Sequence, residues 1–237
     1  MACVLACILL ILAACRAGAA ECAGPADLEA GIRAKPTAEG YSQLGRWFAD
    51  RKQFGCAADA FAAAFRIEPK SASLAYLWGV SLYSAGRSEE AAGALRRAEE
   101  LDPANLPVHL ALGEALDAGK KTDEAEGEWR AALALDPGST AALDHLAQDL
   151  IAQQDYRGVV ALLDGPGSGA TGPARNRPAV ECLDLGIALA GTGRFEDAAV
   201  ALRKGMDLYP DSMPVADELA TVLMFLARAD DAYAVLE

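Results

Sequence analysis

Apolar residues between positions 72 and 102 fall on two helical stripes separated by a short polar turn. Leu74, Trp78 and Leu82 recur at intervals of four and so share one face of a helix, and the apolar residues of 95–101 form a second stripe. Ser88 and the two glutamates after it are typical of a helix start, because a serine caps free backbone N–H groups and acids favour the first turn. The pattern predicts two amphipathic helices joined by a turn.

The same pattern returns every 34 residues along most of the chain. Columns of small residues, large residues and prolines keep this step, and the register later restarts once, five residues late. A fixed period of this length is the signature of stacked helical repeats. The columns comprise Gly45, Gly79 and Gly113; Ala57, Ala91 and Ala125; Phe61, Leu95 and Trp129; Pro69, Pro103 and Pro137; and, after the restart, Gly186, Ala198, Leu202 and Pro210.

The small columns have a physical reason. A glycine at position 79 and an alanine at 91 let the two helices of a pair approach closely. We expect the large residue at 95 or 129 to fill the gap between neighbouring pairs. No single pair can bury its apolar face alone, so the units must stack.

This pattern resembles the tetratricopeptide repeat family. Small, aromatic and proline residues stand where that family places them, as in Gly45, Ala57, Phe61, Ala64 and Pro69, and the next two units repeat the set. The resemblance covers roughly residues 38–237. It implies an all-α fold, namely a right-handed α-solenoid of antiparallel helix pairs, with about five to six repeats of which the last is incomplete.

Family membership also implies a concave groove lined mainly by the first helix of each pair. For Tyr76 and Tyr83, contact with a partner and packing between repeats are equally supported interpretations. The candidate partner-binding residues of the groove are Arg46, Asp50, Tyr76, Val80, Tyr83, Leu110, Glu114, Asp117, His145 and Gln148.

The repeats divide the chain into segments. Residues 38–163 hold four units, residues 164–178 form a loop rich in glycine and proline, and residues 179–237 hold a fifth unit and part of a sixth. The loop contains a literal G-x-G-x-x-G, but a helical register precedes it where a dinucleotide site needs a strand, so we expect no cofactor there. Residues 26–34 look like a separate helix that packs on the first unit.

The first residues have the character of an export signal. Residues 1–14 are nearly all apolar and uncharged, too short to span a bilayer, and typical of the apolar region of a signal peptide. Leu12-Ala13-Ala14-Cys15 resembles the bacterial lipobox, which implies cleavage before Cys15 and lipidation of its thiol. Residues 15–37 would then be the lipidated N-terminus, a tether and the lead-in helix. A plain secretory signal and an uncleaved apolar N-terminus are the alternatives.

Three cysteines remain after such processing: Cys22, Cys56 and Cys182. A disulfide between Cys22 and Cys56 could form in an oxidising compartment. The interpretation we favour is that all three are small buried thiols on helices. Their spacing does not resemble that of a zinc site.

Composition and charge narrow the function. The chain of 237 residues is 53% hydrophobic and only 6% aromatic, and its formal net charge of -13 argues against a surface that binds nucleic acid. The two histidines, His109 and His145, have no acid or cysteine at a spacing that suggests a shared site, so they read as surface or packing residues. We therefore expect no catalytic residues, no cofactor and no metal.

The leading hypothesis is a non-catalytic interaction scaffold at the bacterial cell envelope, anchored by lipid on Cys15 to the outer membrane and facing the periplasm. It would bind a peptide or protein in the groove, and would assist pilus or secretion assembly or recruit envelope enzymes. One alternative is the N-terminal repeat portion of a longer exported enzyme with a catalytic domain beyond residue 237. Another is a homo-oligomer that uses the last repeat as its interface.

Overall fold

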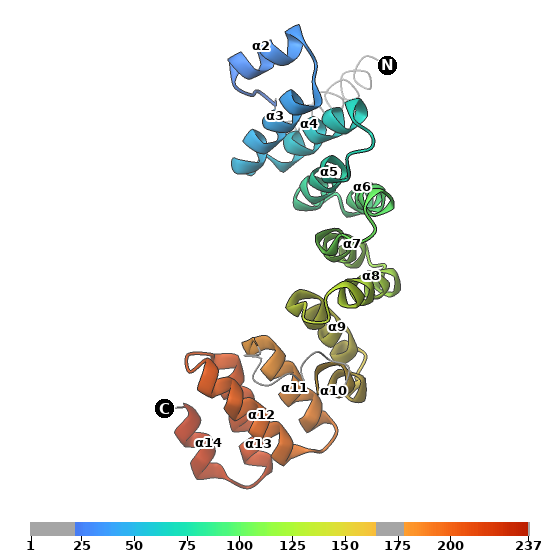
Figure 1. Cartoon of the computed structure of the whole chain (residues 1–237). Helices are drawn as coiled ribbons and strands as arrows, with labels where there is room; N and C mark the ends of the chain where they lie inside the picture. Colours follow the sequence, from blue (N-terminus) through green and yellow to red (C-terminus); the bar gives the residue numbers. More distant parts are fainter. Residues whose placement is uncertain (1–21, 165–177, 237) are drawn as a thin grey trace, which may run out of the picture. The chain divides into compact units, whose positions relative to one another are not determined.

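The computed structural model describes residues 22–164 and 178–236, and all regular structure within them is helical (Figure 1). The signal segment, Cys15 and most of the glycine-rich loop lie outside the described residues. The helices are α2 (Ala26–Ala34), α3 (Ala38–Asp50), α4 (Phe54–Ile67), α5 (Ala72–Ser84), α6 (Ser88–Leu101), α7 (Leu106–Ala118), α8 (Thr122–Leu135), α9 (Thr140–Ala152), α10 (Tyr156–Asp164), α11 (Ala179–Gly191), α12 (Phe195–Leu208), α13 (Met213–Phe225) and α14 (Ala229–Leu236).

Two compact units make up the chain, with a boundary inside α6 after Ala98. In the first unit, α3 packs against α4 and α4 against α5. In the second unit, α7–α8, α9–α10, α11–α12 and α13–α14 pack as pairs, and α11 also contacts the first helices α9 and α13. The second unit has an apolar core of leucine, valine and alanine side chains, which accounts for the small share of aromatic residues.

Each turn inside a pair contains one residue with positive φ. A left-handed backbone conformation suits glycine, which has no Cβ to clash, but glycine occupies this position in only two of the turns. The positions follow the repeat period, including its late restart. They are Lys52, Gly86, Lys120, Gln154, Gly193 and Ala227, with φ between 58° and 78°.

In four of the helix pairs, the large residue of the second helix lies directly over the glycine of the first. A Cβ added to Gly79 would stand 2.5 Å from Leu95, and one added to Gly113 would stand 2.2 Å from the Trp129 ring. Phe61 covers Gly45 and Leu202 covers Gly186 in the same way. The sequence interpretation placed the large residue between neighbouring pairs; the structure shows that its closest contact is inside its own pair.

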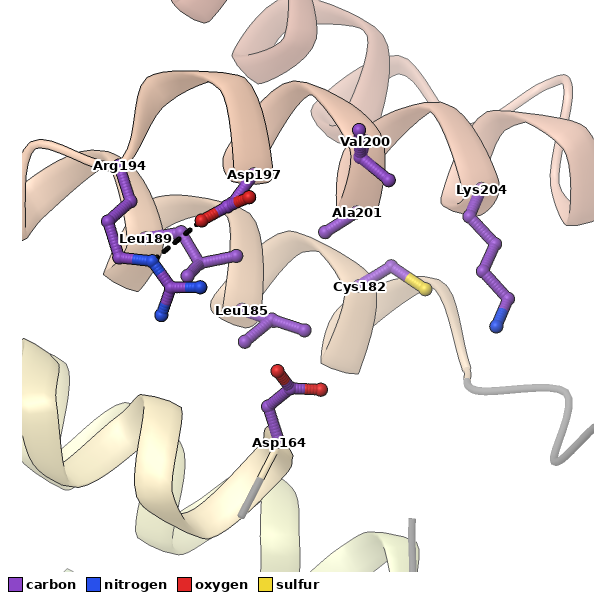
Figure 2. A pocket seen from close by; sticks show the side chains of 9 residues that line it. All are labelled: Asp164, Cys182, Leu185, Leu189, Arg194, Asp197, Val200, Ala201 and Lys204. Atoms are coloured by element: carbon purple, nitrogen blue, oxygen red, sulfur yellow. Dashed lines mark hydrogen bonds and ion pairs between the residues drawn. The ribbon is translucent and has the colours of Figure 1, made fainter. Parts of the chain in front are cut away.

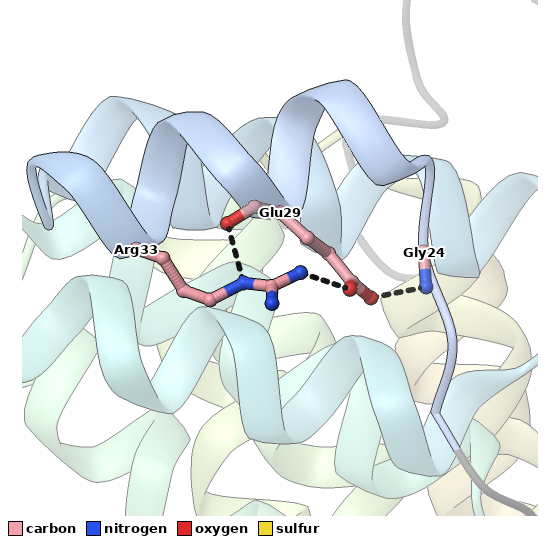
Figure 3. A network of polar contacts seen from close by, with 3 residues as sticks. All are labelled: Gly24, Glu29 and Arg33. Atoms are coloured by element: carbon pink, nitrogen blue, oxygen red, sulfur yellow. Dashed lines mark hydrogen bonds and ion pairs between the residues drawn. The ribbon is translucent and has the colours of Figure 1, made fainter.

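The N-terminal segment is tied to the first unit by a disulfide between Cys22 and Cys56, whose Cα atoms are 5.6 Å apart. The preference for buried thiols was therefore wrong for these two cysteines, whereas Cys182 is buried and is not part of this disulfide. Next to the disulfide, the Gly24 backbone N–H donates to Glu29 at 2.6 Å, and Glu29 also pairs with Arg33 (Figure 3). These contacts link Gly24, before α2, and Arg33, in the last turn of that helix, to the Glu29 side chain.

Candidate functional site

The first unit presents its candidate residues on α3 and α5. Arg46 and Asp50 of α3 are exposed, and Tyr76, Val80 and Tyr83 of α5 are half-buried. Arg46 lines a pocket between these helices, together with Glu39, Ser71 and Ser73. This part of the surface offers polar groups of both signs beside half-buried rings.

The second unit brings several of its candidates together on α7 and α9. His145 lies 3.8 Å from Glu114, and its ring stacks on the buried Trp129 with centroids 4.5 Å apart. Leu110 is half-buried, whereas Asp117 and Gln148 are exposed. The nearby Glu114 carboxylate outweighs burial and raises the pKa of His145, so this residue gains positive charge more easily than a free histidine.

His109 contradicts the expectation that neither histidine has an acidic partner. Its side chain is 5% exposed, Nδ1 lies 2.8 Å from Glu128 Oε2, and Nε2 lies 3.0 Å from the Pro103 carbonyl oxygen. Burial lowers the pKa of His109, but the bonds to Pro103 and Glu128 outweigh it and raise the pKa. With an acceptor at each ring nitrogen, the protonated imidazolium fits this place best. The His145 and Glu114 pair corrects the same expectation.

Glu99 completes the group of described residues that could hold a metal ion. The ligand atoms of Glu99, His109 and Glu128 lie within 4.8 Å of one another. A metal on Nδ1 would have to displace the bond to Glu128, and Nε2 is already held by a carbonyl. We interpret the group as an ion pair that joins α7 to α8.

Replacing His109 with leucine is expected to lower the free energy of unfolding by roughly 1–3 kcal/mol at pH 6, because a charge-assisted hydrogen bond is lost and Glu128 loses its partner. The folded pKa of His109 is raised, so its stabilising effect is complete below the unfolded pKa and is lost as the pH rises through the folded value. Thermal unfolding of both proteins at pH 6 and pH 9 checks this. An equal loss at both values would contradict the ion pair.

Carboxylates that the sequence interpretation did not single out form the most unusual electrostatic feature of the second unit. Asp184 of α11 and Asp149 of α9 each have a buried carboxylate oxygen without a hydrogen-bond partner. Burial raises the pKa of Asp149 and of Glu218 on α13. The repeat period contained a signal for part of this set, because His145, Asp184 and Glu218 occupy the same position in successive first helices.

A separate pocket lies between the end of α10 and the helices α11 and α12 (Figure 2). Leu185 and Leu189 form its floor with Cys182, and Arg194 pairs with Asp197 at its edge, 2.7 Å apart. None of the ten candidate groove residues lines it. The described residues that line this pocket carry charged groups of both signs.

Comparison with known proteins agrees with this architecture. Two overlapping stretches, residues 42–105 and 76–140, match the tetratricopeptide repeat family model. No curated protein sequence is significantly similar to the chain.

Several solved structures share the fold. YrrB, described as a TPR protein with an unusual peptide-binding site, has a TM-score of 0.61 and 18% identity, over 81% of this chain and 97% of its own. PilF of Pseudomonas aeruginosa has a TM-score of 0.60 and 21% identity, over 84% and 86%. MamA of Desulfovibrio magneticus has a TM-score of 0.58 and 19% identity, over 70% and 90%. Residues 42–140 are therefore tetratricopeptide repeats, and the described chain has the all-helical solenoid fold of such proteins.

Proposed function

We propose that the protein is a non-catalytic scaffold that binds a peptide or protein segment on its first helices. The observation that carries this proposal is that none of the ten candidate groove residues is buried, although the glycines of the same helices are covered by large side chains. The first helices therefore keep a mixed surface of charged, polar and aromatic groups available to a partner. Such surfaces suit recognition, because rings supply contact area and the polar groups set orientation.

The solved relatives support the binding of a segment without identifying it. YrrB is described as having a peptide-binding site, and it shares the fold with this chain at 18% identity. Likeness of fold alone does not carry a ligand from one protein to another.

Export and a lipid anchor are part of the same proposal. The Cys22–Cys56 disulfide supports an oxidising compartment, where such bonds persist. Among the described helices, none is long and apolar enough to cross a bilayer. The resemblance of residues 12–15 to a lipobox favours an anchor on Cys15, at the periplasmic face of the outer membrane. Assembly of a pilus or secretion machine, or recruitment of an envelope enzyme, is the kind of process this placement serves.

Replacing Cys15 with serine is expected to move the protein from the membrane fraction to the soluble envelope fraction, because the thiol that would carry the lipid is gone. Fractionation followed by immunoblotting measures the distribution, with Cys182→Ser as the matched control. A Cys15→Ser protein that stays with the membranes as the parent does would contradict the anchor.

The scaffold function is tested by capture from envelope extract with matched surface variants. Leu110→Arg places a charge on the candidate surface, whereas Val200→Arg makes the same change at a side chain that is 70% exposed on the second helix α12. We expect the specific partner to be lost by the first variant and retained by the second. Loss in both, or retention in both, would contradict binding on the first helices.

A further inference from the structure

A pocket of about 200 Å³ between the first helices α3 and α5 contains a hydroxyl group that the fold does not use. The group belongs to Ser42 of α3, which lines the pocket and is only 5% exposed. Ser81 of α5 is buried to the same extent, but its hydroxyl donates to the Leu77 carbonyl oxygen at 2.7 Å. The Ser42 hydroxyl has no hydrogen-bond partner among the described residues, and its oxygen is not closed off from the pocket. A hydroxyl both donates and accepts, so it can bond to either kind of polar group on a ligand.

Arg46, one turn further along α3, brings a positive charge to the same pocket. Elsewhere in the chain, Arg87, Arg194 and Arg228 each pair with an acid three residues later. Among the described residues no carboxylate pairs with Arg46, although the chain has 34 acidic residues against 21 basic ones. A guanidinium has five N–H donors that match the two oxygens of a carboxylate. This end of the pocket is therefore suited to an acid supplied by another molecule.

The opposite end of the pocket is acidic. Glu39 lies seven residues before Arg46 on the same face of α3, which places their Cα atoms about 10 Å apart. Glu39 accepts a hydrogen bond from the neutral Gln43 amide at 2.8 Å, so its negative charge is not balanced. Glu68 follows the last residue of α4, and because α4 runs back along α3 after a short turn, its end lies level with the start of α3. Both glutamates line the pocket and are exposed.

We propose that this pocket binds a partner segment with one basic and one acidic side chain at alternate positions, the basic one toward Glu39 and Glu68 and the acidic one toward Arg46. The inference rests on the proposed scaffold function and adds the charge pattern of the bound segment. Alternate residues of an extended chain point to the same side about 7 Å apart, so long side chains at these positions span the pocket. Acids alone would meet the two glutamates, and bases alone would meet Arg46.

Peptide titrations followed by NMR of the isotope-labelled full chain test this pattern, because NMR measures weak binding and locates it. Two alanine–serine peptides with blocked ends carry lysine and glutamate separated by a single residue, one peptide for each order. A third peptide carries the two charges at its opposite ends, and a fourth has glutamine at both positions. All four peptides are neutral overall, so the net charge of -13 favours none of them. Arg66→Gln removes an exposed arginine from the second helix α4 and is the matched control for Arg46→Gln.

We expect one of the two alternating peptides to shift the backbone amide signals of Ser42, Arg46 and Ser73, and to bind roughly threefold more tightly than the glutamine peptide. Arg46→Gln should remove this advantage, because the ion pair with the acid of the peptide is lost, and Arg66→Gln should preserve it. The site is overturned if neither alternating peptide binds more tightly than the glutamine peptide and the peptide with separated charges, or if Arg46→Gln binds as the wild type does. If Leu110→Arg loses the captured partner and Arg46→Gln binds it with unchanged affinity, this inference fails while the scaffold function stands.

Discussion

Replacing Gly113 with alanine is expected to lower the free energy of unfolding by about 3 kcal/mol, although alanine is the better helix former. The added Cβ would stand 2.2 Å from Trp129 Nε1 and 2.6 Å from its Cδ1. The ring cannot yield easily, because it is fully buried and stacked on His145. Either α7 and α8 separate or the ring leaves its rotamer, and both outcomes disturb the packing of the pair.

Gly127 provides the matched control in the neighbouring helix. A Cβ at Gly127 meets nothing within 4 Å, so Gly127→Ala should stabilise α8 by up to about 1 kcal/mol. If the repeat register is right, urea unfolding should show that Gly113→Ala lowers the free energy of unfolding and that Gly127→Ala raises it. A second change, Trp129→Leu, should restore part of the stability of Gly113→Ala, since Ala147 and Leu163 already form this combination in the next pair. Two alanine variants of equal stability would contradict the close contact of Gly113 with Trp129.

The Asp184→Asn protein is expected to become increasingly more stable than the wild-type protein as the pH rises. The unfolded aspartate loses its proton near pH 3.8, but burial and neighbouring acids raise the folded pKa to about 7. Between these values the folded protein holds a proton that the unfolded chain has released, so stability falls as the pH increases. The asparagine variant escapes this loss, which amounts to up to about 4 kcal/mol by pH 8. Melting temperatures from pH 4 to pH 8 measure the difference.

Glu196→Gln separates this effect from a general change of net charge. Glu196 is exposed on α12, so its loss should leave the pH profile of stability close to that of the wild type. The two profiles, wild type and Asp184→Asn, should lie together near pH 4 and diverge above it. Parallel profiles across the whole range would contradict a buried Asp184 carboxylate without a hydrogen-bond partner.

The repeat period explains why so much of the fold could be predicted from the sequence. Gly79 and Leu95 stand in columns that recur at one spacing, and a steric requirement of this kind leaves a small residue and a large residue at these two positions in successive units. The period alone does not determine which large residue packs on which glycine. The interpretation therefore placed Leu95 between pairs, whereas the structure places it on Gly79.

The ion pairs were missed, and the disulfide was named but not preferred, for a different physical reason. His109 and Glu128 are 19 residues apart, a distance set by two helices and a turn and not by any helical step. Cys22 reaches Cys56 only because the segment before α2 runs alongside the first pair. For Asp184, the sequence shows an acid within an apolar helix but not that its carboxylate is buried without a partner. Such pairings depend on packing, which a periodic pattern does not describe.

Site-specific photo-crosslinking in living cells tests the central claim most directly. A photoreactive amino acid is placed at Tyr76 or Leu110 on the first helices, and at Val200 or Tyr233 on exposed parts of the second helices. The scaffold account predicts that one partner protein is crosslinked from the first two positions and not from the last two. Crosslinks to a partner from Val200 and Tyr233 alone would contradict it.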